Sequence, residues 1–134
     1  MKWAIELVPL PVTDVDRAKR FYAEQVGFAV DVDAAPAEGF RVVQLTPPGS
    51  ACSIVIGTGI VHTPPGSVQG LHLCVYDITA ARAELVGRGV AVDEVRHMVD
   101  GVWRDGPGGD YNAFASFSDP DGNTWTLQQV PERD

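Results

Sequence analysis

The sequence contains one pattern of residues twice, and this duplication constrains the fold more than any other feature. At a shift of 63 positions the first copy matches the second in type at Leu10, Val12, Asp14, Val15 and Ala18, which align with Leu73, Val75, Asp77, Ile78 and Ala81. At a shift of 62 the match continues at Gly27, Phe28, Val30 and Asp31, which align with Gly89, Val90, Val92 and Asp93. A recurring order of strand, cap, helix, glycine and strand predicts two copies of one structural unit.

The first copy predicts a βαβββ unit. Pro9 and Pro11 lie in an apolar stretch and indicate an edge strand, because proline donates no hydrogen bond to a neighbouring strand. Asp14 is a suitable N-cap, and Gly27 suits the C-terminus of the helix that follows. We expect strands at 3–12, 28–33, 40–46 and 51–56, a helix at 15–26 and a loop at 34–39.

The second copy predicts the same order with an insertion. Asp77 is the expected cap of a helix whose apolar stripe ends before Gly89. We expect strands at 68–76, 90–95, 113–118 and 124–130, an irregular segment at 96–112 and a turn at 119–123. The fold class is therefore α+β, with residues 1–134 as one domain built from modules at 1–62 and 66–130.

Composition excludes several classes of partner. The formal net charge is −8, which opposes binding to nucleic acid or to an anionic membrane surface. No apolar run approaches the length of a membrane span, and the N-terminal residues do not resemble a secretory signal. Cys52 and Cys74 are too few for a disulfide framework, so we expect reduced thiols and a cytoplasmic location.

Four segments together resemble the vicinal oxygen chelate superfamily, which includes glyoxalase I, extradiol dioxygenases, fosfomycin-resistance enzymes and bleomycin-binding proteins. The segments are 10–14 (LPVTD), 17–22 (RAKRFY), 27–28 (GF) and 117–123 (FSDPDGN). The resemblance implies paired βαβββ modules whose sheets curl around a cavity. It also implies a homodimer and, in metal-dependent members, ligands at matched positions of the two modules.

The residues at those implied ligand positions are poor metal ligands. They are Leu7, Gly70, Thr126 and, on the fourth strand, Ser53 or Ile54. Transition metals need imidazole, thiolate or carboxylate. We therefore expect no metal at these positions and no cofactor. A displaced site is the alternative: His72 and Gln128 lie two residues beyond Gly70 and Thr126, and Glu6 would need a bulge to join them.

Six residues are the expected ligand-binding set: His72, Gln128, Thr126, Trp103, Tyr111 and Leu7. His72 either lines a cavity or bonds a neighbouring carbonyl. Thr126 and Gln128 either bind a polar ligand or form a solvated face. Trp103, Arg104 and Tyr111 lie in a glycine-rich segment that is either a lid over a flat ligand or a surface loop.

Other chemistry-bearing residues have simpler explanations. Cys74 shares the side of the strand with His72, but the spacing is long for a Cys–His pair and no basic residue is adjacent in sequence, so we expect a packing role. His62 and His97 are expected in solvated loops. Arg41 and Gln44 have opposite parity, so only one can face a cleft. Asp119, Asp121 and Asn123 fit turn chemistry better than a calcium loop.

The sequence favours a small-molecule-binding protein with an apolar or aromatic ligand, such as a metabolite or drug. A metal-dependent lyase or isomerase with a displaced site at His72 is the enzymatic alternative. A regulatory or scaffolding module that holds no ligand is a third possibility. A cationic guest would be compatible with the acidic charge of the whole chain.

Overall fold

The computed structural model describes residues 1–133, which form two compact units. The first unit is Met1–Val68 together with Asp119–Asn123. The second unit is Gln69–Ser118 together with the chain from Thr124 onward. No helix among the described residues is long and apolar enough to cross a membrane.

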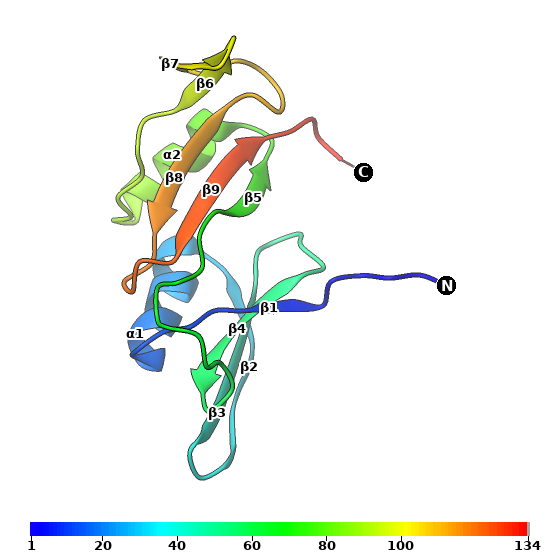
Figure 1. Cartoon of the computed structure of the whole chain (residues 1–134), viewed down its shortest axis with the longest axis vertical. Helices are drawn as coiled ribbons and strands as arrows, with labels where there is room; N and C mark the ends of the chain where they lie inside the picture. Colours follow the sequence, from blue (N-terminus) through cyan, green and yellow to red (C-terminus); the bar gives the residue numbers. More distant parts are fainter. Residues whose placement is uncertain (134) are drawn as a thin grey trace. The chain divides into compact units, whose positions relative to one another are not determined.

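The first unit is a four-stranded mixed sheet with one helical segment (Figure 1). The strand order is β1-β4-β3-β2, in which β1 pairs with β4 in parallel and the other pairs are antiparallel. The elements are β1 (Leu7–Pro9), α1 (Val15–Arg20), the π-helix η1 (Phe21–Val26), β2 (Ala29–Ala37), β3 (Phe40–Thr46) and β4 (Ser53–Thr58).

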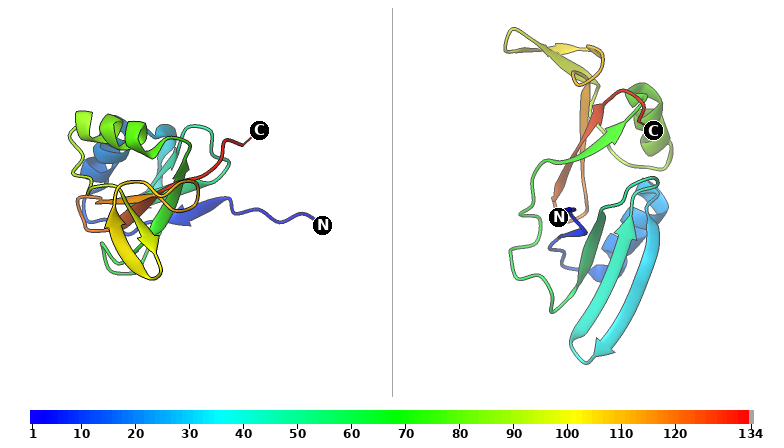
Figure 2. Two further views of the ribbon diagram at one scale, coloured as in Figure 1. Left: turned by 90° about the horizontal axis from the view of Figure 1, so that it is seen from above. Right: turned by 90° about the vertical axis from the view of Figure 1, so that its right-hand side faces the viewer.

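The second unit is a five-stranded mixed sheet in the order β5-β9-β8-β6-β7. Helix α2 packs on one face of it against β8 and β9 (Figure 2). The elements are β5 (Leu71–Val75), α2 (Ile78–Gly87), β6 (Arg96–Val99), β7 (Val102–Asp105), β8 (Phe114–Ser118) and β9 (Thr124–Gln129).

The two units share a topology, as the repeat predicts. In each, the first strand pairs in parallel with the last strand, and the helix follows the first strand. The order β1-β4-β3-β2 corresponds to β5-β9-β8-β6, with β7 added at the edge. The predicted α+β fold class is therefore confirmed, whereas the module bounds 1–62 and 66–130 stay a prediction.

Both predicted helix caps are confirmed. Asp14 Oδ1 accepts a 3.0 Å hydrogen bond from the backbone nitrogen of Arg17, and Asp77 Oδ1 accepts one of the same length from Ala80. Gly27 ends the first helical segment with φ +94°, which suits a residue without Cβ. The helix expected over 15–26 is α-helical only to Arg20 and then continues as η1, because apolar spacing over six residues does not separate the two helix types.

Several predicted strand bounds are wrong. The strand expected at 3–12 is only β1, since prolines at 9 and 11 offer no N–H to a neighbouring strand. The loop expected at 34–39 is largely strand, because β2 continues to Ala37 and pairs with Phe40 at its tip. No strand forms at 90–95, where Asp93 nitrogen donates a 3.0 Å hydrogen bond to Ser116 oxygen. The strand expected at 40–46 is confirmed as β3, and the limits of the remaining strands differ from expectation by at most three residues.

The segment expected to be irregular, 96–112, contains a hairpin. β6 and β7 pair through a two-residue turn at Asp100 and Gly101, with Val99 opposite Val102. Both turn residues have positive φ, +48° and +78°, as a type I′ turn requires. The hairpin extends the sheet of the second unit beyond β8 (Figure 2).

Candidate functional site

The face of the second sheet opposite α2 carries most of the expected ligand-binding residues. Strand register places two rows of side chains across this face, because residues paired across neighbouring strands point to the same side. The first row is Asp105, Arg96, Phe114, Gln128 and Cys74, and the second row is Ser116, Thr126 and His72. These side chains are half-buried or exposed, whereas the alternate residues Ala115, Phe117, Trp125 and Leu127 are buried. We call this surface the open face.

A chain of hydrogen bonds makes Nδ1 of His72 a donor. Gln128 Nε2 donates to the backbone oxygen of Tyr111 at 3.2 Å, and that oxygen can only accept. The amide oxygen of Gln128 therefore faces His72, whose Nδ1 lies 3.2 Å away and must donate. A neutral His72 then has a lone pair on Nε2, for which no protein partner exists among residues 1–133. The ring can accept a hydrogen bond from a ligand.

Tyr111 holds a backbone conformation that is rare for a large side chain. Its φ is +63°, and its nitrogen donates a 2.7 Å hydrogen bond to Gln129 oxygen. The ring is 57% exposed. Residues kept in such conformations concentrate at functional sites, and Tyr111 lies beside Gln128, whose amide donates to its backbone oxygen.

Trp103 lies on β7 and stands edge-on against Phe114 of the open face. The ring centroids are 5.7 Å apart and the planes meet at 88°. The Arg96 guanidinium covers the Trp103 ring at 4.8 Å from its centroid. Asp93 holds that arginine, since its Oδ2 lies 2.8 Å from Arg96 Nη1. The tryptophan is 48% exposed, and its contacts with Phe114 and Arg96 hold the ring in one orientation.

A shallow hollow of about 540 Å³ lies in the second unit. The hydroxyl groups of Ser116, Ser118 and Thr124 contribute to its lining. Asp93 also lines it, and its Oδ1 accepts a 2.6 Å hydrogen bond from Ser116 nitrogen. The same carboxylate therefore contacts β8 through one oxygen and Arg96 through the other.

Two expectations about side chains on this unit are wrong. Cys74 is exposed rather than packed, and Arg133 Nη1 lies 3.7 Å from its sulfur. A basic residue is therefore close in space although none is close in sequence. His97 is not in a loop: it lies on β6, half-buried, and its Nδ1 donates to Gly106 oxygen at 2.7 Å.

Leu7, the sixth expected residue, belongs to the first unit. It lies on β1 opposite Ser53, in the register of a parallel pair. Ser53 is buried, and its Oγ lies 2.6 Å from Thr46 Oγ1 and 3.3 Å from Gln44 Nε2. Gln44 thus faces the side of the sheet opposite to Arg41, as the parity predicts.

The side chains at the implied ligand positions do not fit the metal site that the fold implies. Leu7 has no lone pair, and Ser53 already shares its hydroxyl with Thr46 and Gln44. On the second unit Gly70 has no side chain, and Thr126 is paired with His72. Within residues 1–133, no group of three or more His, Cys, Asp or Glu side chains is arranged to hold a metal ion.

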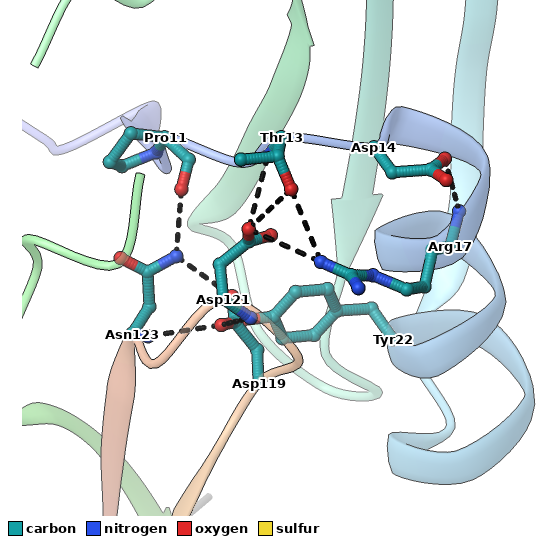
Figure 3. Close-up of polar contacts among 8 residues, drawn as sticks. All are labelled: Pro11, Thr13, Asp14, Arg17, Tyr22, Asp119, Asp121 and Asn123. Carbon is teal, nitrogen blue, oxygen red and sulfur yellow. Dashed lines mark hydrogen bonds and ion pairs between the residues drawn. The ribbon is translucent and has the colours of Figure 1, made fainter. Parts of the chain in front are cut away.

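A buried polar network joins the helix of the first unit to the turn at Asp119–Asn123 (Figure 3). Tyr22 hydroxyl donates to Asp119 Oδ2 at 2.8 Å, and Asn123 Nδ2 donates to the same oxygen and to Pro11 oxygen. Asp121 Oδ1 accepts from the Thr13 hydroxyl at 2.6 Å. The turn is therefore structural, as predicted, but its partners were not foreseen, because they lie about a hundred residues away in sequence.

Asp33 is the ionisable group with the most perturbed environment. Hydrogen bonds from Arg41, and then from Lys19, hold the pKa of its carboxyl well below the usual range. Arg41 binds Asp33 with two nitrogens, at 3.1 and 3.0 Å, and Asp16 with a third at 2.7 Å. These contacts fasten α1 to β2 and β3, so Arg41 is structural.

Comparison with known proteins places the chain in a family. Residues 4–127 match the model of the Glyoxalase/Bleomycin resistance protein/Dioxygenase superfamily. The chain belongs to this superfamily, which confirms the resemblance seen in the sequence. A search of curated proteins found no match.

Similar solved structures include TnmS3, described as an antibiotic binding protein from Streptomyces sp. CB03234. It is 38% identical with a TM-score of 0.76, and the match covers 96% of this chain and 97% of that one. A glyoxalase/bleomycin resistance protein from the same organism is also 38% identical, with a TM-score of 0.73 and coverage of 94% and 100%. A superfamily member from Sphaerobacter thermophilus DSM 20745 is 27% identical, with a TM-score of 0.76 and coverage of 96% and 98%.

Proposed function

We propose that this protein binds a planar, apolar or aromatic small molecule, such as an antibiotic, on the open face. The observation that carries the proposal is the convergence of His72, Thr126 and Gln128 with two exposed aromatic side chains in one unit. Trp103 and Tyr111 supply ring surface, and the strand residues supply hydrogen-bonding groups. The description of TnmS3 as an antibiotic binding protein supports the same class of ligand.

Sequestration, rather than catalysis, is the function this arrangement supports best. His72 has a lone pair, but its hydrogen-bond partner is a neutral amide and not a carboxylate that would strengthen it as a base. Leu7, on β1 of the first unit, is proposed separately as an apolar ligand contact. The metal-dependent lyase alternative gains no support from the donor set described above.

A homodimer and a cytoplasmic location complete the proposal. All nine residues of β2 are exposed, and β2 is an edge strand with apolar Val30 and Val32. An exposed edge of this kind favours pairing with a second copy. Light scattering of the purified chain would distinguish a dimer from a monomer.

Binding can be tested with N-phenyl-1-naphthylamine, a neutral aromatic dye, followed by competition with a panel of aromatic antibiotics. We expect saturable dye binding that Trp103→Ala weakens by about tenfold, because the indole supplies stacking area. Trp3→Ala is the matched control, since Trp3 is 87% exposed and belongs to the first unit. Absence of saturable binding by the dye and by every antibiotic, or equal effects of the two substitutions, would contradict the proposal.

A further inference from the structure

From the distribution of charge on the open face we infer that its ligand carries a negative charge or an acceptor-rich edge, not a positive charge. This inference rests on the proposed function and narrows it to acidic planar molecules, such as aromatic carboxylates, sulfonates and phenolates. The net charge of −8 of the whole chain would instead favour a cationic ligand. A bound ligand meets the charges on this face and not the sum over the chain.

The three strands that form the centre of the open face contain no charged residue other than the titratable His72. Their sequences are LHLCV for β5, FASFS for β8 and TWTLQQ for β9. A cationic ligand bound across them would meet no carboxylate on these strands. Binding a charge without a counter-charge is unfavourable, so these strands offer nothing that selects a cation.

An arginine lies on each side of the centre of the first row. Arg96 lies on β6 between Phe114 of β8 and Asp105 of β7, and Asp105 is the outermost residue of the row. At the other end Arg133 Nη1 lies 3.7 Å from Cys74 sulfur. Guanidinium groups only donate hydrogen bonds, and they bind carboxylate and sulfonate oxygens well.

Each arginine keeps donors available. Among residues 1–133, Arg96 uses only Nη1, toward Asp93, and its side chain is 32% exposed. Arg133 contacts a sulfur, which is a weak acceptor that an anion would outcompete. The row therefore has a polar and aromatic centre with available N–H donors on both sides, whereas its carboxylates, Asp105 and the Asp93 that binds Arg96, lie beside β6 at one side only.

The indole ring of the open face is already covered by a cation. Cations bind the faces of aromatic rings, and indole is the best such surface in proteins. Arg96 covers the Trp103 ring at 4.8 Å from its centroid. A cationic ligand would be repelled by that guanidinium, whereas an anionic one could contact the edge of the ring and the arginine together.

Two dyes test the inference because they differ by one group. 1-Anilinonaphthalene-8-sulfonate is N-phenyl-1-naphthylamine with an added sulfonate. We expect the sulfonate dye to bind at least about tenfold more tightly. Arg96→Gln and Arg133→Gln should each weaken the sulfonate dye by about three- to tenfold and change the neutral dye by less than about twofold.

Arg104→Gln is the matched control. Arg104 lies next to Trp103 on β7 but has the opposite parity, so it points away from the open face, and its loss changes the net charge equally. It should leave both dyes unaffected. Arg133 belongs to the exposed C-terminal segment after β9, so its variant tests the inference even if Arg96→Gln disturbs the hairpin.

The outcomes separate the two proposals. Equal affinity for the two dyes, or the same loss in Arg104→Gln as in Arg133→Gln, overturns the inference and leaves the proposed binding function standing. Failure of both dyes and of the antibiotic panel to bind overturns the binding function and the inference with it. Tighter sulfonate binding that falls only in the Arg96 and Arg133 variants supports the inference.

Discussion

The hydroxyl of Tyr22 donates a 2.8 Å hydrogen bond to Asp119 Oδ2, and both side chains are buried. Removal of the hydroxyl would leave the carboxylate with one fewer donor, since Asn123 Nδ2 also binds this oxygen. We expect Tyr22→Phe to lower the free energy of unfolding by about 1.5–3 kcal/mol, the usual value for a buried hydrogen bond to a charged group.

Chemical denaturation of Tyr22→Phe measures this loss. Tyr76→Phe is the control, because Tyr76 is 50% exposed and its hydroxyl makes no hydrogen bond among the described residues. A Tyr22→Phe variant as stable as the control would show that the network contributes no net stability.

Gly66 lies where the chain passes close to the Asp119–Asn123 turn. Its φ is +78°, and a Cβ built on it would overlap the backbone oxygen of Asp121. Gly66→Ala therefore combines backbone strain with a backbone clash, and we expect a loss above about 2 kcal/mol. Gly49 has a similar φ of +83° with nothing within 4 Å of such a Cβ, so Gly49→Ala measures the strain alone. Thermal melting of both variants gives the difference, and equal melting temperatures would contradict the predicted clash.

Asp33 should titrate at unusually low pH because Arg41 and Lys19 stabilise its charged form. A lowered pKa in the folded state contributes stability that is present above the ordinary aspartate pKa of about 3.9 and is lost as pH falls through the folded value. Arg41→Gln should raise the pKa of Asp33 toward the ordinary value and move acid unfolding to higher pH. NMR titration of the Asp33 carboxyl carbon measures the shift.

Arg20→Gln is the control for that titration. Arg20 lies on α1, the helix that carries Asp16 and Lys19, and it is exposed and without a hydrogen-bond partner among the described residues. An unchanged Asp33 pKa in Arg41→Gln, or an equal change in both variants, would argue against direct stabilisation by Arg41.

Zinc or nickel should not stabilise the protein. A ligand that binds the folded state raises its melting temperature, and the donor set around His72 offers one imidazole and neutral amide or hydroxyl groups. We expect tenfold excess metal to shift the melting temperature by less than about 1 °C in the wild type and in His72→Ala. Stoichiometric metal that is lost on substitution of His72 would restore the lyase alternative.

The sequence predicts the elements whose signals are local. Asp14 and Asp77 cap their helices as expected, and Gly27 ends the first helical segment with positive φ. The hairpin at β6 and β7 was missed, although Asp100-Gly101 between apolar residues is a strong type I′ signal. The surrounding segment is rich in glycine, which is typical of loops, so the segment does not show the alternation of apolar and polar residues that indicates a strand.

The side-chain partners were less predictable than the strands. Strand parity correctly groups His72, Thr126 and Gln128. Thr126 is an implied ligand position, and the other two lie two residues beyond such a position, on the same side of their strands. No sequence rule connects Arg133 with Cys74 or Asp93 with Ser116, since those contacts depend on how distant strands and tails meet. The partners of Asp119 and Asp121 were missed for the same reason.

The membership of Asp119–Asn123 in the first unit has a consequence for biosynthesis. Tyr22 and Pro11 are translated early, but their hydrogen-bond partners on this turn are added about a hundred residues later. The amino-terminal half therefore cannot complete its interior while it emerges from the ribosome. Its buried network is complete only after the Asp119–Asn123 turn has been synthesised and has left the ribosome.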